Sequence, residues 1–167
     1  HDSVCAIYIY NKEYFDNKRE AQKWWISKSL ESLEKDLNKF NINLTILVSE
    51  EIKFFSKIND KNISFYWNKI YEPAQFELDN KVETILRNKN IKYKLFKGNV
   101  LNEYNSITKN DGTPFKVFSP FWRHAEQIYL DKVPPKENKI KKQNKKLSIF
   151  NSKNKPKDLL PKYDWYK

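Results

Sequence analysis

The chain has 167 residues, of which 39% are hydrophobic and 16% aromatic, a composition that predicts one domain with a core and argues against wholesale disorder. No apolar run reaches the roughly 18 residues of a membrane helix and no signal-peptide pattern opens the chain, which predicts a cytoplasmic protein without a membrane partner. The formal net charge is +11, and the single cysteine, Cys5, excludes an internal disulfide.

The first third of the chain predicts two strands and two helices. A β-branched and aromatic run at 4–10 predicts a strand, and apolar residues at three- and four-residue steps predict a helix over 19–40. The short apolar run at 44–48 is typical of a parallel strand covered on both faces. A short helix is predicted over 51–57.

The middle of the chain continues this alternation. It predicts strands over 63–67 and 91–96, a helix beginning at Pro73, and a helix over 120–130 that Ser119 caps and Pro120 begins. Alternation of this kind predicts an α/β fold, a Rossmann-like doubly wound parallel sheet with right-handed crossovers. The two glycines, Gly98 and Gly112, are too few for a dinucleotide fingerprint or a phosphate loop.

The carboxyl end holds most of the charge. Ten lysines and one acid, Glu137, lie between positions 132 and 157, so this window carries +9 and the rest of the chain only +2. Residues 136–157 lack apolar periodicity and predict a flexible or extended linker, and Leu159 to Pro161 with Trp165 restore anchoring groups. A solvated loop is the ordinary interpretation of such a charge run, and contact with a DNA backbone is the alternative.

Three patches carry a family resemblance. They are Trp24-Trp25 with the leucines that follow, the run Tyr66 to Pro73, and the run Gly-Thr-Pro-Phe-Lys-Val-Phe-Ser-Pro-Phe-Trp at 112–122. In this order and spacing they resemble the amino-terminal, antenna-binding α/β domain of the DNA photolyase and cryptochrome family. In that family a strand and a helix precede this region and a helical flavin domain follows it. The resemblance therefore implies a fragment, with residues 1–132 as the α/β domain lacking its first strand and 133–167 as a basic linker toward an absent flavin domain.

The resemblance also implies a function. It implies the amino-terminal part of a deoxyribodipyrimidine photolyase, a flavoprotein lyase that repairs cyclobutane pyrimidine dimers in damaged DNA with light. FAD would belong to the absent domain, so the fragment alone is expected to be an inactive monomer with no catalytic residue. A cryptochrome photoreceptor domain and a stand-alone basic nucleic-acid-binding module are the alternatives.

The resemblance places an antenna, a folate or a deazaflavin, near the carboxyl ends of the strands, and Tyr10, Asn11 and Glu72 are the candidate contacts. An aromatic ring can stack on a flat heterocycle and a carboxylate can accept hydrogen bonds from it. Beside Pro73, Glu72 is equally explained as an acid at a helix start. Ile70 and Ala74-Gln75 depart from the patterns of deazaflavin and folate binders, so the antenna's identity stays open. No metal site is predicted, since His1 and His124 lack partners at ligand spacing.

Overall fold

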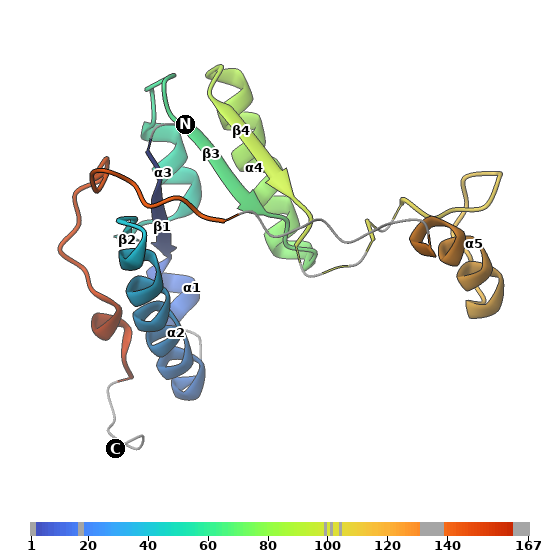
Figure 1. Ribbon diagram of the computed structural model, residues 1–167, viewed down its shortest axis with the longest axis horizontal. Helices are drawn as coiled ribbons and strands as arrows, with labels where there is room; N and C mark the ends of the chain where they lie inside the picture. Colours follow the sequence, from blue (N-terminus) through green and yellow to red (C-terminus); the bar gives the residue numbers. More distant parts are fainter. Residues whose placement is uncertain are drawn as a thin grey trace. The chain divides into compact units, whose positions relative to one another are not determined.

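A computed structural model describes residues 3–16, 19–98, 100, 102–103, 105–130 and 139–161. The chain divides into two compact units (Figure 1). The first unit combines His1–Ile58 with Lys139–Lys167, and the second is Asn59–Asn138. Each unit contains one pair of parallel strands.

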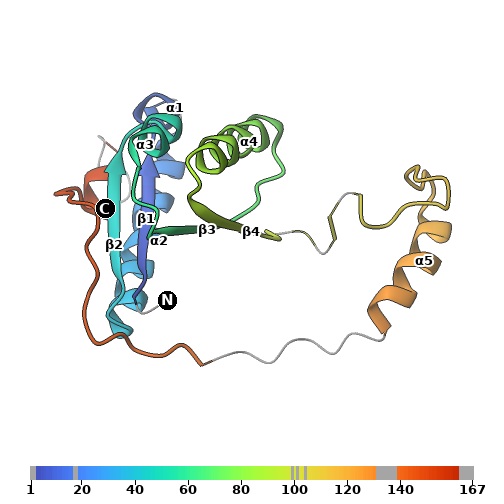
Figure 2. The ribbon, with the colours of Figure 1, turned by 90° about the horizontal axis from the view of Figure 1, so that it is seen from above.

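The first unit is built on two parallel strands whose neighbours are helices. Strand β1 pairs with β2 from Cys5 opposite Asn43 to Tyr10 opposite Val48. In order along the chain the elements are β1 (Cys5–Tyr10), α1 (Lys12–Asp16), α2 (Glu20–Lys39), β2 (Asn43–Val48), α3 (Glu51–Lys57) and the 3-10 helix η1 (Pro156–Leu159). Figure 2 shows α2 running along the β1–β2 pair.

Both faces of this strand pair are covered. On one face the buried side chains of Leu30, Ile46 and Leu159 meet Phe15. Successive strand residues point to opposite faces, so Leu47 faces the other way, where it lies near Phe54 of α3. Coverage on both faces explains the continuous apolar run of β2.

The second unit holds β3 (Ser64–Asn68), α4 (Pro73–Asn88), β4 (Lys92–Phe96) and α5 (Phe118–Leu130). Strand β3 runs parallel to β4, from Ser64 opposite Lys92 to Asn68 opposite Phe96. The buried residues Phe65, Val82 and Leu86 belong to β3 and α4. Trp67 of β3 donates its indole N–H to Asp79 of α4 at 3.1 Å, which fixes the helix on the strand.

Two asparagines terminate the long helices. Asn41 and Asn90 have φ of 59° and 56°, the left-handed conformation that asparagine tolerates better than most residues. The amides that follow them return to the helix, Ile42 N to Leu37 O at 3.0 Å and Ile91 N to Leu86 O at 2.9 Å. Each asparagine therefore ends a helix in a Schellman motif and turns the chain into the next strand.

The structure confirms the α/β class with parallel strands, and it adds three findings. The described strands form two two-stranded sheets, β1–β2 and β3–β4. Helices α1 and η1 were not predicted from the sequence. Helix α5 begins at Phe118, so the prediction that Ser119 caps a helix begun by Pro120 is wrong. Proline is tolerated at this place because the first helical N–H groups have no intrahelical acceptor.

The carboxyl-terminal segment differs most from expectation. The sequence predicts a flexible or extended linker over 136–157, and the described part, 139–157, belongs to the compact first unit. The backbone is extended, but Pro156 and Leu159 are buried, and Phe150 meets Phe54 edge to face at 5.1 Å. The anchoring role predicted for Leu159 is confirmed, while Trp165 lies outside the described residues.

Candidate functional site

Tyr10, the last residue of β1, lies at the carboxyl end of the first strand pair. Its ring meets Phe15 edge to face with centroids 4.5 Å apart, and its hydroxyl donates to Asp16 at 3.5 Å. Partial burial, and then the negative charge of Asp16, raise the pKa of the Tyr10 hydroxyl. One ring edge is thus committed to the core, and the hydroxyl stays protonated at neutral pH.

Asn11 links β1 to α1 and has structural partners. Its Oδ1 accepts the amide of Tyr14 at 3.4 Å, as a helix N-cap does. Its Nδ2 donates to Glu51 of α3 at 3.4 Å. A ligand that uses the Asn11 amide group would therefore have to replace or share these long hydrogen bonds.

Glu72 lies in the second unit, where it precedes α4. Its backbone is extended and its carbonyl accepts the amide of Phe76 at 2.8 Å, but its side chain makes no capping hydrogen bond. The side chain is exposed. Its carboxylate therefore does not cap the helix. It follows the carboxyl end of β3, and α/β folds bind ligands at the carboxyl ends of their strands.

The structure gathers a polar group near Glu72 that the sequence did not predict. Lys69 Nζ lies 3.1 Å from Glu103 Oε1. That hydrogen bond raises the pKa of Lys69. Desolvation of the Tyr71 hydroxyl and then the Glu103 carboxylate raise the pKa of Tyr71. Lys69 therefore stays cationic and Tyr71 neutral near pH 7, which gives this strand end hydrogen-bond donors beside the Glu103 carboxylate.

A close backbone approach sets the position of this group. A Cβ added to Gly98 would lie 2.3 Å from the carbonyl oxygen of Lys69. Only glycine therefore lets the chain after β4 pass the chain after β3 at this distance. The scarcity of glycine in the sequence is a signal that could have drawn attention to Gly98.

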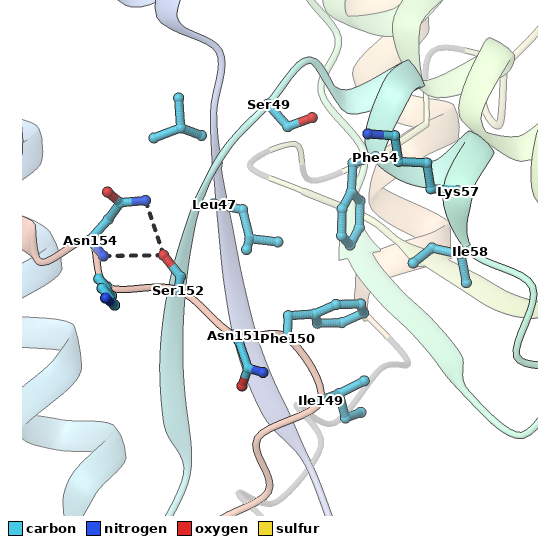
Figure 3. A pocket seen from close by; sticks show the side chains of 12 residues that line it. Leu47, Ser49, Phe54, Lys57, Ile58, Ile149, Phe150, Asn151, Ser152 and Asn154 are labelled. Carbon is cyan, nitrogen blue, oxygen red and sulfur yellow. Dashed lines mark hydrogen bonds between the residues drawn. The ribbon is translucent and has the colours of Figure 1, made fainter.

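The first unit also contains a cavity of about 580 Å³ at the carboxyl end of β2. Its lining includes Leu47, Val48, Ser49, Phe54, Lys57, Ile58 and residues 149–154. Figure 3 shows the rings of Phe54 and Phe150 turned toward one another, with Ser152 and Asn154 hydrogen-bonded nearby. Half of the lining comes from residues predicted to be linker, so the sequence did not reveal this cavity. The apolar pair Ile149-Phe150 within the lysine run was the available signal.

The aromatic run at 115–122 packs largely on itself and on His124. Phe118 stacks on Trp122 with ring centroids 6.1 Å apart, and Phe115 lies 5.7 Å from the ring of His124. Phe118 is nonetheless 70% exposed. Before the helix, Asp111 accepts the amide of Thr113 at 2.9 Å, and Gly112 turns the chain with φ of 78°. The run is therefore a tight turn followed by the aromatic start of a helix.

Two negative findings apply to the described part of the chain. It contains no group of three or more histidine, cysteine, aspartate or glutamate side chains that could hold a metal ion. Within the same residues, no helix is long and apolar enough to cross a membrane.

Comparison with known proteins identifies relatives. The family described as DNA photolyase matches residues 1–141. A deoxyribodipyrimidine photo-lyase of Agrobacterium fabrum is 28% identical over 156 residues, which are 88% of this chain and 31% of that protein. Cryptochrome-1 of Arabidopsis thaliana is 22% identical over 80% of this chain and 21% of its own length.

Solved structures show the same fold. A bacterial class III photolyase from Agrobacterium tumefaciens matches with a TM-score of 0.69 and 24% identity, over 95% of this chain and 33% of its own. An archaeal photolyase from Sulfolobus tokodaii, solved with two FAD molecules, matches with a TM-score of 0.66 and 19% identity, over 95% of this chain and 35% of its own. The chain thus spans about a third or less of the length of these relatives.

Proposed function

Because the chain belongs to the DNA photolyase family, we propose that it is the amino-terminal part of a deoxyribodipyrimidine photolyase. The observation that supports this proposal most directly is the family match over residues 1–141. In the whole protein, FAD held by a following helical domain would supply the light-driven electron transfer that splits a cyclobutane pyrimidine dimer. The residues of this chain would contribute antenna binding and none of the catalytic groups.

The pairing of the strands supports this domain assignment. In the doubly wound order 3-2-1-4-5, strand 2 pairs with strand 3 and strand 4 pairs with strand 5, on either side of strand 1. The observed parallel pairs, β1 with β2 and β3 with β4, are the pairs expected if the chain supplies strands 2 to 5. We therefore propose that residues 1–132 form the α/β domain and that a basic segment over 133–167 follows it.

Light-dependent repair is the direct test. The full-length product of the gene and the 167-residue chain are each mixed with a thymine-dimer oligonucleotide, and loss of dimers is measured under blue light and in the dark. We expect repair in the light by the full-length protein and none by the chain alone. Repair by the chain alone would contradict the absence of catalytic groups. A flavin-loaded full-length protein that leaves dimers intact would favour the cryptochrome alternative, to which the similarity is weaker.

For the antenna we propose Tyr10 and Asn11 of the first unit and Glu72 of the second unit as contacts. Glu72 is the sharpest candidate, because its exposed carboxylate makes no capping bond and could accept hydrogen bonds from ring N–H or hydroxyl groups. Tyr10 and Asn11 already have hydrogen-bond partners. Tyr10 would therefore stack its ring face on the ligand, and Asn11 would share its side-chain amide between the ligand and Glu51. When bound, the antenna would absorb light and pass excitation energy to the flavin.

Binding can be tested without any repair assay. A reduced folate, a deazaflavin and FAD are each titrated into the protein, and binding is followed by the ligand's fluorescence. FAD is included because the archaeal relative holds two FAD molecules. We expect Glu72→Gln to lower the affinity for the ligand about tenfold, the effect of losing one hydrogen bond to a charged group. Glu77→Gln, an exposed change on the same helix, is the matched control. Equal affinities of the two variants would remove Glu72 from the site.

A further inference from the structure

The described carboxyl-terminal segment is the most strongly charged part of the molecule. Residues 139–157 contain eight lysines and no acid, so they supply +8 of the net charge of +11. All eight lysines, at positions 139, 141, 142, 145, 146, 153, 155 and 157, are exposed. A long-range positive field therefore originates from 19 consecutive residues.

Contacts with the first unit fix the path of this segment. Gln143 donates its backbone amide to Phe40 O at 2.9 Å, and its side-chain amide to Val4 O at 2.9 Å. Farther on, Ser152 donates its hydroxyl to the carbonyl of Ile46. Figure 1 shows the segment, in orange and red, following the first unit toward η1. The backbone is therefore ordered before any partner binds, so a partner does not have to overcome the entropy of ordering it.

The lysines of the segment are not neutralised within the described structure. None of the eight lies in an ion pair with a described acid, and Lys146 donates to the neutral Asn38 side chain at 2.6 Å. Elsewhere, several lysines pair with acids one helical turn away, including Lys28 with Glu31 at 3.0 Å and Lys39 with Asp36 at 2.6 Å. The segment is thus an ordered strip of eight exposed lysines that form no ion pair with a described acid.

The chemistry of the strip favours a nucleic acid over a membrane. Membrane-surface segments present a row of apolar side chains beside their cations, whereas the large apolar side chains exposed here are only Ile140 and Ile149, nine residues apart, and Phe150 packs on Phe54. Each strand of duplex DNA carries one phosphate charge per roughly 3.4 Å of helix axis, a dense polyanion that a strip of exposed lysines can neutralise. Lysine carries a point charge without the fork that reads guanine, so contact would be to phosphates.

We propose that residues 139–157 form a sequence-independent contact surface for the phosphate backbone of duplex DNA. This inference rests on the proposed function only for the choice of DNA over RNA. The surface would bind undamaged and damaged DNA equally. It would add affinity to that of the groups that recognise the lesion.

Salt-dependent binding tests the proposal. The affinity of the 167-residue chain for a fluorescent, undamaged duplex is measured by anisotropy at several KCl concentrations. Variant Q4 replaces Lys139, Lys141, Lys142 and Lys145 by glutamine, and control C4 replaces the exposed Lys35, Lys61, Lys81 and Lys92. The two variants have the same net charge, so a difference between them reports position.

We expect Q4 to bind at least tenfold more weakly than C4 at about 0.05 M KCl. Its slope of log K against log salt should be shallower by about 3 to 4, since each phosphate contact contributes about 0.9. The same four lysines changed to arginine should retain the affinity. If Q4 loses its helical circular dichroism, the triple variant K153Q/K155Q/K157Q replaces it, with a slope shallower by about 2 to 3.

Equal affinities of Q4 and C4 would overturn the proposal, and so would tighter binding of the chain to phosphatidylserine vesicles than to the duplex. A preference for RNA over DNA of equal length would also contradict it. The repair assay gives an independent readout, because loss of dimers by the full-length protein supports the proposed function whatever this titration shows.

Discussion

Ser27 of α2 donates its hydroxyl to the carbonyl of Pro156 at 2.8 Å, joining residues 129 positions apart. The Ser27 side chain is fully buried. An amphipathic helix that must bury a serine needs an acceptor for the hydroxyl, and the carboxyl-terminal segment supplies it. This bond shows that the segment is part of the folded unit.

Replacing Ser27 by alanine should destabilise the chain by about 1 to 3 kcal/mol, because the Pro156 carbonyl loses its buried donor. The free energy of unfolding is measured by urea titration followed by circular dichroism. Ser29→Ala, an exposed change two residues along the same helix, should cost less than about 0.5 kcal/mol. Equal effects of the two substitutions would show that the bond to Pro156 does not form in solution.

Leu159→Ala should cost about 2 to 5 kcal/mol, the range for emptying a core leucine site. Leu159 is 5% exposed and packs with Phe15, Leu30 and Ile46. The half-buried neighbour Leu160 provides the control, since Leu160→Ala should cost clearly less. If neither change moves the urea midpoint, Leu159 does not anchor the carboxyl-terminal segment in the core.

The two glycines should respond differently to alanine. At Gly112 an added Cβ meets nothing within 4 Å, so only the positive φ of 78° disfavours alanine. Gly112→Ala should therefore cost about 1 to 2 kcal/mol of stability. At Gly98 the new Cβ would lie 2.3 Å from a backbone oxygen, so the chain must shift and the loss of stability should exceed that at Gly112. Thermal unfolding of both variants checks the order, and the reverse order would contradict the close approach of Gly98 to Lys69.

Asp79 should make stability fall as pH rises. Burial raises the pKa of Asp79 above its ordinary value of 3.8, although the Trp67 hydrogen bond opposes the shift. A carboxyl whose folded pKa is raised contributes stability below its unfolded pKa and loses that contribution as pH rises through the folded value. Asp79→Asn keeps an acceptor for Trp67, so its stability relative to the unmodified chain should increase from about pH 3 to pH 6.

Asp111 gives the opposite control. Hydrogen bonds from Thr113 lower the pKa of Asp111, so its contribution is present above the unfolded pKa and is lost as pH falls through the folded one. The penalty of Asp111→Asn should therefore grow as pH rises over the same window. Urea midpoints of both variants across this range provide the measurement, and trends of the same sign would refute one of the two assignments.

The sequence by itself determined the order of the main elements, the parallel α/β class and the family resemblance. These features are local: apolar spacing marks α2 and α4, β-branched runs mark β1 and β2, and Asn41 and Asn90 favour helix ends. The family resemblance likewise depended on residues adjacent in the chain, such as those at 112–122.

Only the tertiary structure decided where the basic segment lies. Extended backbone has no periodicity of its own, and the segment is held by partners about 100 or more residues away, among them Phe40, Ile46 and Ser27. The cavity that Phe54 and Phe150 help to line has the same origin. Such contacts depend on the fit between surfaces distant in sequence and on buried backbone groups that need hydrogen-bond partners. Neither can be inferred from a short stretch of sequence.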